Sequence, residues 1–424
     1  MSALRVVDFR RLWLAGLISE IGDWLLLVSL PIVVYEYTGS TFGTAAALLI
    51  ELVPPVFLAP LAGRLADRLD RRRTLLLVAL AQAVTLTPLL LVHGRAGLPI
   101  VYAVIAVQSA LRALFEPTKN ALLPTLVDRD RLVSANSMVG LNTNVGRLVG
   151  GPLGGLLLAA GGGLRAITLV DAASFLLAFA LIARLAPARE VAPNAQAGAP
   201  LTGWRMVLRS RPIRAGLVVV LTASVAQGIF AALFVVFVAR ALHGGAAEIG
   251  LLRGVQGIGA IGCGLGLGLI RRVAPARMAA VAAIGFGGLS FAIWNAPAIS
   301  TAQPLYVALF IVAGAPGVAL LTGLVSALQE ASVEGQRGKV FAAVGVAASV
   351  GEAMGLLAAG VLGDPLGIVT VLNAQAGLYV VAGLLAAFWL AAPTARAKRP
   401  ACESPSIASG RKDQKTWNAW VSTG

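Results

Sequence analysis

Long apolar runs recur from one end of the chain to the other, separated by short segments rich in arginine. Runs of this length, about 18–27 residues each, can cross the roughly 30 Å hydrocarbon core of a bilayer as α-helices with some tilt. The pattern therefore predicts an all-α integral membrane protein with twelve transmembrane helices. The expected helices are 12–35, 43–63, 74–93, 98–116, 136–160, 165–186, 214–240, 247–270, 277–296, 304–327, 339–362 and 367–391.

The composition agrees with this interpretation, because 58% of the residues are hydrophobic and only 12% are charged. A soluble domain of 424 residues needs more charge to cover its surface. The formal net charge of +15 has two explanations, nucleic-acid binding or the collection of lysine and arginine in cytoplasmic loops. The positive residues lie between the apolar runs, so we favour the second explanation and expect no nucleic-acid partner.

The distribution of the positive residues assigns the two sides of the membrane. With a cytoplasmic N-terminus, 28 lysines and arginines fall on the inner side, and Arg95, Arg165 and Arg240 fall on the outer side. Three more arginines lie within the spans, namely Arg112, Arg147 and Arg253. This asymmetry predicts an even number of spans, cytoplasmic N- and C-termini and a place in the inner or plasma membrane.

A loop rich in alanine, proline, glycine and arginine divides the spans into two groups of six. We expect an N-terminal half at 1–186, a cytoplasmic central loop at 187–212, a C-terminal half at 213–391 and a mobile cytoplasmic tail at 392–424. The halves match at an offset of about 205 residues. The matched pairs are Gly63 and Gly268, Gly140 and Gly345, Val145 and Val350, Gly146 and Gly351, Gly150 and Gly355, and Gly155 and Gly360. Two parallel halves are typical of a transporter that rocks one half against the other.

Acidic residues inside the apolar runs are candidates for function, because a charge in the bilayer needs a partner or a watery cavity. Glu20 and Asp23 lie three residues apart in the first span and so share a helix face. Glu51 in the second span and Glu352 in the eleventh are further candidates. These carboxylates suit proton coupling or recognition of a cationic solute. The alternative is a structural role, in ion pairs with the arginines that lie within the spans.

The internal repeat brings one further pair of charges into register. Arg147 and Glu352 occupy the same position of the two halves, near the middle of the membrane. We therefore expect opposite charges that face one cavity, where they set its field or change partners as the halves rock. Coincidence is the alternative explanation.

The segment Gly63-Arg-Leu-Ala-Asp67-Arg68-Leu-Asp-Arg71-Arg72-Arg73 follows the second span. It resembles the signature between spans two and three of the major facilitator superfamily, with Asp70 where glycine is common. In that superfamily the cluster latches the two halves on the cytoplasmic side. The resemblance implies this role for Gly63, Asp67, Arg68, Arg71 and Arg72. Charge that only fixes the topology is the alternative.

Gly151-Pro152-Leu-Gly154-Gly155 in the fifth span resembles the antiporter motif of the same superfamily, with Arg147 where its upstream glycine usually stands. Other segments are similar to the macrolide- and siderophore-efflux branch: Phe9–Trp13, Gly22–Trp24, Pro117–Val127, Leu132–Ser137 and Arg337–Phe341. The resemblance implies export in exchange for protons, through a cavity lined by spans one, four, seven and ten. In that cavity we expect Glu20, Asp23, Gln108, Arg112 and Gln227.

The sequence contains no nucleophile constellation for catalysis and no phosphate-binding loop with Lys and Ser/Thr. The two cysteines and two histidines have no metal-ligand spacing, and Gly257–Gly262 matches a dinucleotide fingerprint without a preceding strand. We therefore expect no enzyme, no cofactor and no metal.

The sequence predicts a monomeric secondary active transporter in the lipid bilayer. We expect it to export a small amphipathic substrate, such as a drug, macrolide or siderophore, by proton antiport with alternating access. Uptake or lysolipid translocation on the same fold is one alternative. A membrane scaffold or receptor that does not transport is another, and the acids inside the spans argue against it.

Overall fold

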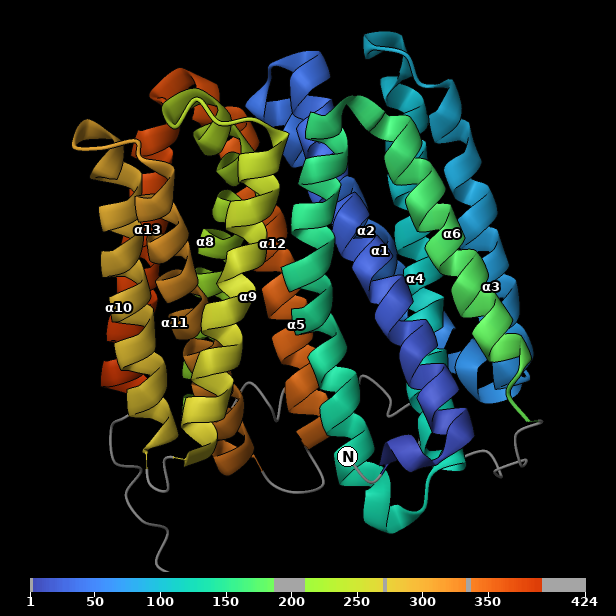
Figure 1. The fold of residues 1–424 in the computed structure, drawn as a ribbon. Helices are drawn as coiled ribbons and strands as arrows, with labels where there is room; N and C mark the ends of the chain where they lie inside the picture. The colour runs from blue at the N-terminus through green and yellow to red at the C-terminus, as the bar shows by residue number, and fades with distance from the viewer. Residues whose placement is uncertain (1–2, 187–209, 270–272, 333–336, 391–424) are drawn as a thin grey trace, which may run out of the picture. The chain divides into compact units, whose positions relative to one another are not determined.

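The computed structural model describes residues 3–186, 210–269, 273–332 and 337–390. Within these ranges the side chains of residues 59, 60, 62–68, 129, 133, 389 and 390 are not described. The described backbone forms long α-helices joined by short turns, and no strand occurs in it. Figure 1 shows the long helices packed side by side.

The helices of the N-terminal half are α1 (Val7–Thr38), α2 (Thr41–Arg68), α3 (Arg71–Leu86), α4 (Leu98–Leu126), α5 (Leu132–Leu157) and α6 (Gly163–Ala183). Those of the C-terminal half are α8 (Arg211–Ala241), α9 (Ala246–Leu269), α10 (Pro275–Asn295), α11 (Gln303–Ala331), α12 (Arg337–Leu366) and α13 (Ile368–Leu385). The short helical turns are η1 (Ala3–Arg5), η2 (Thr87–Leu91), η3 (Arg95–Gly97), η4 (Arg129–Arg131), η5 (Leu158–Gly162), η6 (Ala296–Ala298) and η8 (Ala386–Leu390).

The all-α membrane fold is confirmed. By length and composition, the described residues form eleven helical stretches that are apolar enough to cross a membrane. The expected number was twelve, and the difference arises where the fifth and sixth expected spans join into one stretch, Ser134–Ala183. Inside this stretch α5 and α6 are separated by Gly161 and Gly163, with φ angles of 77° and 55°. Glycine adopts this left-handed backbone at little cost, so the chain can turn here.

The largest difference from the expected boundaries is at α4, which ends at Leu126 rather than at 116. The helix continues through Pro117 and Pro124. Neighbouring helices can satisfy the backbone groups that a proline frees, so proline is tolerated inside membrane helices. As a result Lys119, which we assigned to a cytoplasmic loop, lies inside α4, is buried and pairs with Glu116 at 2.6 Å.

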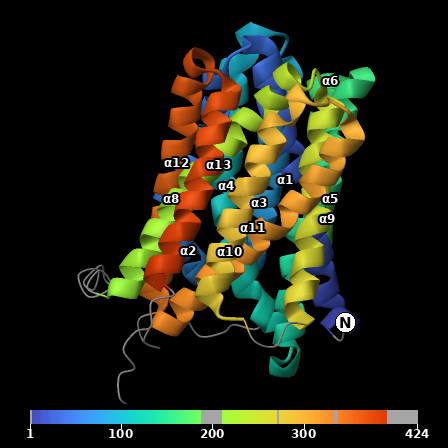
Figure 2. The same ribbon diagram turned by 90° about the vertical axis from the view of Figure 1, so that its left-hand side faces the viewer.

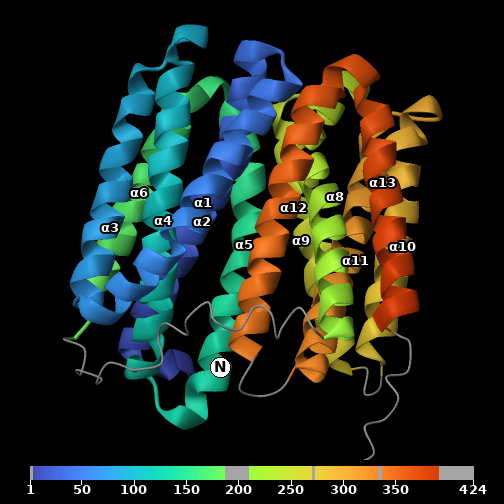
Figure 3. The ribbon, with the colours of Figure 1, turned by 180° about the vertical axis from the view of Figure 1, so that it is seen from behind.

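The same helix pairings recur in the two halves. In the N-terminal half α1 packs against α5 and α6, α3 against α4 and α6, and α2 against α4. In the C-terminal half the corresponding pairs are α8 with α12 and α13, α10 with α11 and α13, and α9 with α11. Figure 2 shows α8, α12 and α13 together, and Figure 3 shows the two groups from behind. This correspondence supports the prediction of an internal repeat.

Glycines of the repeat bring equivalent helices close together. A methyl group added at Gly150 would overlap the Ile21 carbonyl oxygen, so α5 lies directly on the backbone of α1. At the matched position in α12, a methyl group at Gly355 would overlap the Val225 carbonyl oxygen of α8. The halves therefore use the same residue type at the same place for close backbone approach.

The most extensive pairings between the halves are those of α5 with α9 and of α2 with α12. The tightest described contacts of α5 with α9 lie where α5 ends and α9 begins, at the upper end in Figure 1, and looser contacts continue to Asn144 and Gly257. A methyl group at Gly155 would overlap the Ala246 carbonyl oxygen, and one at Gly250 would come within 2.6 Å of the Gly151 carbonyl oxygen. Because of these crossing contacts, residues 1–391 form one compact unit.

A polar network joins four helices at the same end. The Arg240 guanidinium on α8 binds Asp364 on α12 at 2.8 Å and also donates to the Tyr35 hydroxyl and the Gly39 carbonyl oxygen, each at 2.8 Å. Thr41 at the start of α2 donates its hydroxyl to the other Asp364 oxygen at 2.9 Å. We call Tyr35, Thr41, Arg240 and Asp364 the end network. It connects the two halves through hydrogen bonds to charged groups, the stronger kind in proteins.

The contact between α5 and α9 gives a first prediction. Gly155→Ala should lower the thermal unfolding midpoint of the purified protein, by an amount equivalent to about 1–3 kcal/mol, because the added methyl group meets backbone atoms of α9. Gly140→Ala on the same helix is the matched control, since its methyl group would meet nothing within 4 Å. It should be neutral or stabilise by roughly 0.5–1 kcal/mol. Equal midpoints for the two variants would contradict this packing.

Candidate functional site

One arginine on α4 holds three carboxylates from two other helices. Arg112 places its guanidinium nitrogens 3.5 Å from a Glu20 oxygen, 3.7 Å from an Asp23 oxygen and 4.0 Å from a Glu51 oxygen. Glu20 and Asp23 come from α1, and Glu51 comes from α2. We call these four residues the Arg112 cluster. Ion pairs with the arginines inside the spans were the structural alternative expected for these acids. Arg112 forms such pairs.

The carboxylates of the cluster differ in their access to the space between the halves. The Glu20 and Asp23 side chains are 8% and 14% exposed, whereas that of Glu51 is 32% exposed. If all four groups were ionised, three negative charges would face one positive charge. In a low-dielectric setting the excess negative charge is costly. The cluster can therefore accept a proton or another cation.

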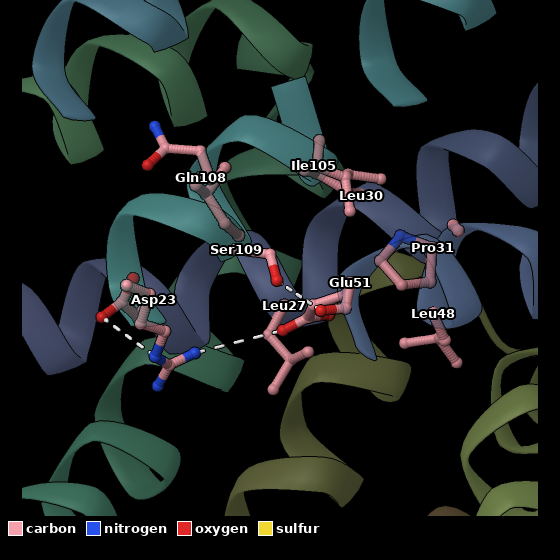
Figure 4. A pocket seen from close by; sticks show the side chains of 12 residues that line it. Asp23, Leu27, Leu30, Pro31, Leu48, Glu51, Ile105, Gln108 and Ser109 are labelled. Atoms are coloured by element: carbon pink, nitrogen blue, oxygen red, sulfur yellow. Dashed lines mark hydrogen bonds and ion pairs between the residues drawn. The ribbon is translucent and has the colours of Figure 1, made fainter. Parts of the chain in front are cut away.

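A small pocket of about 40 Å³ lies beside the cluster, between α1, α2 and α4 (Figure 4). Asp23 and Glu51 both line it, and the Ser109 hydroxyl donates a hydrogen bond to the Glu51 backbone carbonyl oxygen. Gln108 also lines this pocket and donates its amide to the Gln82 carbonyl oxygen at 2.9 Å. The pocket is therefore polar on the side of the cluster, and apolar where Leu30 and Pro31 close it.

A much larger cavity, of about 780 Å³, lies between the two halves. Its charged lining comes from both halves: Glu51, Arg112, Glu116, Arg147, Arg253 and Glu352. The resemblance implied a lining from spans one, four, seven and ten. The lining includes α1, α4 and α8, and in addition α2, α5, α9 and α12. Arg147 and Glu352, the matched pair of the repeat, thus line one cavity. Among the described residues, their side chains do not approach to the 4.0 Å of an ion pair.

A second cavity, of about 430 Å³, extends from this region into the C-terminal half. It shares Arg147, Gln227 and Arg253 with the larger cavity. Aromatic rings of α8, α10 and α11 form much of its wall, and α11 completes the set of four helices that the resemblance implied. The Gln227 side-chain oxygen accepts a hydrogen bond from the Tyr379 hydroxyl at 3.2 Å.

The two other intramembrane arginines lie on aromatic rings. The guanidinium carbon of Arg147 is 4.8 Å from the centre of the Trp24 ring. That of Arg253 is 5.1 Å from the Phe230 ring and 5.8 Å from the Phe234 ring. Cation–π contacts of this kind attract an arginine to a ring face, but they do not supply a counter-charge.

The proposed cytoplasmic latch lies only partly within the described side chains. The side chains of Gly63, Asp67 and Arg68 are outside them, although α2 remains helical up to Arg68. Arg71 begins α3, and the Arg72 guanidinium donates to the carbonyl oxygens of Ile182 and Ala183 at the end of α6. The described contacts of Arg72 therefore stay inside the N-terminal half, and the latch remains a prediction.

The residues of the antiporter-like motif lie where α5 packs between α1 and α9. Gly151 and Gly155 face α9, and Pro152 lies against Gly254 of that helix. Gly154 faces α1, where an added methyl group would come within 2.9 Å of the Leu25 carbonyl oxygen. The motif thus allows α5 to contact a helix of each half at close range.

One buried acid was missed in the sequence. Asp171 on α6 is fully buried, and one of its oxygens has no hydrogen-bond partner among the described residues. Its other oxygen accepts from the Ser174 hydroxyl at 3.0 Å and lies against Gly22, next to Asp23 on α1. A single acid in an otherwise apolar helix was a signal available in the sequence.

Comparison with known proteins identifies the family. The family described as "Transmembrane secretion effector" matches residues 1–410. The chain belongs to the major facilitator superfamily. This confirms the resemblance carried by the segment after the second span and by the motif in α5. The relatives in this superfamily are transporters and not enzymes. This multi-pass membrane protein is likewise a transporter.

Several relatives of this major facilitator chain are named as exporters. It is 25% identical over 391 residues to the multidrug efflux pump Tap of Mycolicibacterium fortuitum, covering 88% of this chain and 93% of Tap. It is 27% identical over 319 residues to the enterobactin exporter EntS of Salmonella choleraesuis, covering 71% of this chain and 73% of EntS. The match to the uncharacterized transporter YfiS of Bacillus subtilis has 29% identity and spans only 39% of the length of each chain.

Solved structures show the same fold at low sequence identity. A bacterial homologue of the iron transporter ferroportin, in an inward-facing state, has a TM-score of 0.71 at 17% identity, and the match covers 92% of this chain and all of that one. The nucleoside transporter NupG has a TM-score of 0.70 at 13% identity, over 89% of this chain and 98% of NupG. At these identities the likeness establishes the fold alone.

The Arg112 cluster gives a second prediction. Arg112→Gln should lower the unfolding midpoint, because three carboxylates lose the cation that compensates them. Removing one partner of a fully buried pair costs about 3–5 kcal/mol, and we expect less here because Arg112 is 30% exposed. Adding Asp23→Asn to the Arg112→Gln chain should restore part of the loss. Strictly additive effects of the two changes would contradict the coupling.

Proposed function

We propose that this transporter exports a small amphipathic compound in exchange for protons, by alternating access. The observation that carries the proposal is the Arg112 cluster, which places three carboxylates and one guanidinium beside a cavity between two helical halves. A membrane scaffold gains nothing from the cost of such charges. A proton-coupled transporter needs groups of this kind, because it must bind and release a proton as it changes state.

Direction and substrate class follow from the relatives and from the cavity. Tap is named as a multidrug efflux pump and EntS as an enterobactin exporter, which supports export of drug-, macrolide- or siderophore-like compounds. A volume of about 780 Å³ suits a compound of that size, since binding pockets for drug-sized ligands have about 300–1,000 Å³. The mixture of apolar and charged lining suits an amphipathic compound.

Within the cluster we assign different tasks to the carboxylates. Glu51 lines the large cavity and is the most exposed of the three, so it is the group that exchanges protons with the cavity. Asp23 lies deeper, on the other side of the Arg112 guanidinium. A proton on either carboxyl releases that group from Arg112 and strengthens the arginine's attraction to the remaining acids. This exchange of partners would link the proton to the relative positions of α1, α2 and α4.

The contacts between the halves support alternating access. The glycine contacts of α5 with α9 and the end network hold the halves together at one end. The large cavity instead extends along α2 and α4 toward the other end, as far as Pro55 and Pro117. We assign that other end to the cytoplasm of a monomer in the inner membrane, because the arginine-rich segments and both termini are expected there.

The proton-coupling proposal gives a third prediction. Cells that carry the transporter should retain less of an exported compound, in an efflux panel on a pump-deficient host, and collapse of the proton gradient should remove this effect. Asp23→Asn and Glu51→Gln should each reduce efflux to the level of cells without the transporter, because each removes a carboxylate from Arg112. Glu36→Gln is the control, since this exposed acid on α1 lies outside the cluster.

The outcomes of this experiment separate the alternatives. Efflux that persists without a proton gradient would contradict proton antiport. Gradient-dependent accumulation would indicate uptake, and the absence of transport for every compound of the panel would favour a scaffold or receptor. Full efflux by both cluster variants would rule out the assigned roles.

The end network gives a fourth prediction, which tests alternating access and orientation together. In intact cells, Leu48→Cys in the cavity wall of a chain without other cysteines should react slowly with a membrane-impermeant maleimide. Asp364→Asn removes the charge that holds Arg240 and should destabilise the state that is closed at this end by about 1 kcal/mol. The labelling rate should then increase roughly fivefold, because the open state is populated more often.

Two controls complete this labelling experiment. Glu248→Gln should leave the rate unchanged, because Glu248 accepts a hydrogen bond from the backbone of Gly245 within the C-terminal half. Arg71→Cys, at the opposite end of the bundle, should not react from outside the cell. Labelling at Arg71→Cys would contradict the assigned orientation, and an unchanged rate in Asp364→Asn would contradict the role of the end network.

A further inference from the structure

We propose that the compound transported is an organic anion with an apolar, ring-containing body, and that Arg147 and Arg253 bind its anionic group. The inference rests on the proposed function and names the chemistry of its substrate. The binding position is the region shared by the two cavities, because both arginines line both of them.

The first observation is that neither arginine has an acid within ion-pair distance in the described part of the chain. Arg112 and Arg240 each form ion pairs at 4.0 Å or less, whereas no such pair includes Arg147 or Arg253. The Nε of Arg147 is buried and has no hydrogen-bond partner among the described residues. A charged group inside a membrane needs compensation, and a bound anion would supply it.

The second observation is how the guanidinium groups are held. Arg147 lies over the Trp24 ring, and Arg253 lies over the rings of Phe230 and Phe234. A cation–π contact attracts a guanidinium to a ring without using its N–H donors as hydrogen-bond partners of an acceptor atom. Both groups are therefore prepared to donate to carboxylate, sulfonate or phenolate oxygens, and their planar geometry favours bidentate contacts.

The third observation is the sign of the charge around the two arginines. The guanidinium groups repel each other electrostatically. Glu352 attracts Arg253 and Glu20 attracts Arg147, but neither acid reaches ion-pair distance. No carboxylate occurs in the described lining of the second cavity. An anion between the two arginines would relieve their repulsion and gain attraction from both.

The wall of the second cavity fits the apolar part of such a compound. Phe230, Trp294 and Phe310 form a connected group of rings, with centroids 6.1 Å apart for the first two and 6.4 Å apart for the last two. The Trp294 nitrogen donates to Gln375 at 3.0 Å, so the indole ring is held in place. A cavity of about 430 Å³ with this wall admits a fused aromatic ring system.

A cationic compound is the competing possibility, because the Arg112 cluster contains three acids. All three, however, already lie within 4.0 Å of the Arg112 guanidinium. The uncompensated groups that both cavities share are positive. The observations therefore favour an anion. A cationic probe of the same ring system tests the alternative.

The test measures equilibrium binding to the purified full-length protein by calorimetry, with three probes that share one ring system. The probes are 2-naphthoate, neutral 2-naphthamide and the cation 2-naphthylmethylammonium. Naphthoate should bind at least about tenfold more tightly than the amide, since hydrogen bonds from charged groups contribute about 1.5–3 kcal/mol and 1.4 kcal/mol is a factor of ten. This comparison uses the unaltered chain and does not depend on any variant.

Variants locate the binding site. Arg147→Gln and Arg253→Gln should each remove most of the preference for naphthoate over the amide, while Arg253→Lys should keep part of it because the charge remains. Arg165→Gln is the matched control, since Arg165 is exposed and binds His93 outside both cavities. Its preference should equal that of the unaltered chain. Unfolding midpoints of all variants show whether each is folded.

Equal binding of naphthoate and the amide, or tighter binding of the cation, would overturn the proposal. So would a preference for naphthoate that survives in both glutamine variants. Binding is measured without a gradient, so these results are independent of export. Proton-driven efflux combined with no anion preference would reject this inference and keep the proposed function. An anion preference without gradient-driven efflux would reject the proposed function and keep the anion site.

Discussion

A charge in the membrane interior needs a partner or a watery cavity, and the way each charge meets this need explains how this transporter is built. Arg112 connects α4 to both α1 and α2 because it compensates Glu20, Asp23 and Glu51 at the same time. At the end of the bundle, Arg240 connects α8 to α12 and to the chain between α1 and α2. The cost of an uncompensated charge makes such contacts specific, since no neighbouring residue of another type can replace them.

Close backbone packing complements these polar contacts. Inside each half, a glycine of the repeat brings α5 onto α1 and α12 onto α8. Between the halves, Gly155 and Gly250 allow an equally close approach at the end where α5 ends and α9 begins. Packing of this kind acts over a short range, so it is lost once the helices separate by a few ångströms. A combination of tightly packed halves with a shorter interface between them suits motion of one half relative to the other.

Much of this arrangement could be predicted from the sequence, but contacts between distant helices could not. A spacing of three residues places Glu20 and Asp23 on one face of α1, and the repeat places Arg147 and Glu352 in one cavity. That Glu51 would reach the same guanidinium depends on how α2 packs on α4, which no local pattern specifies. The fourth span was expected to end at 116, but α4 continues to Leu126, so Lys119 lies inside this helix and not in the loop after it. Asp171 was missed although its position in an apolar helix was informative.

The separation of charge has a consequence for the energetics of the proposed export. The acids of the Arg112 cluster lie on α1 and α2, whereas Arg147 and Arg253, which have no acid within ion-pair distance among the described residues, lie on α5 and α9. A proton on the acidic side and an anion on the basic side can therefore be bound by different groups. If one proton enters while one organic anion leaves, both movements carry positive charge inward. A potential that is negative inside drives each by about 2.3 kcal/mol per 100 mV, so the two movements together gain about 4.6 kcal/mol before any pH gradient contributes. Such an exchange would proceed on the membrane potential alone, whereas exchange of a neutral compound for a proton would gain only half as much.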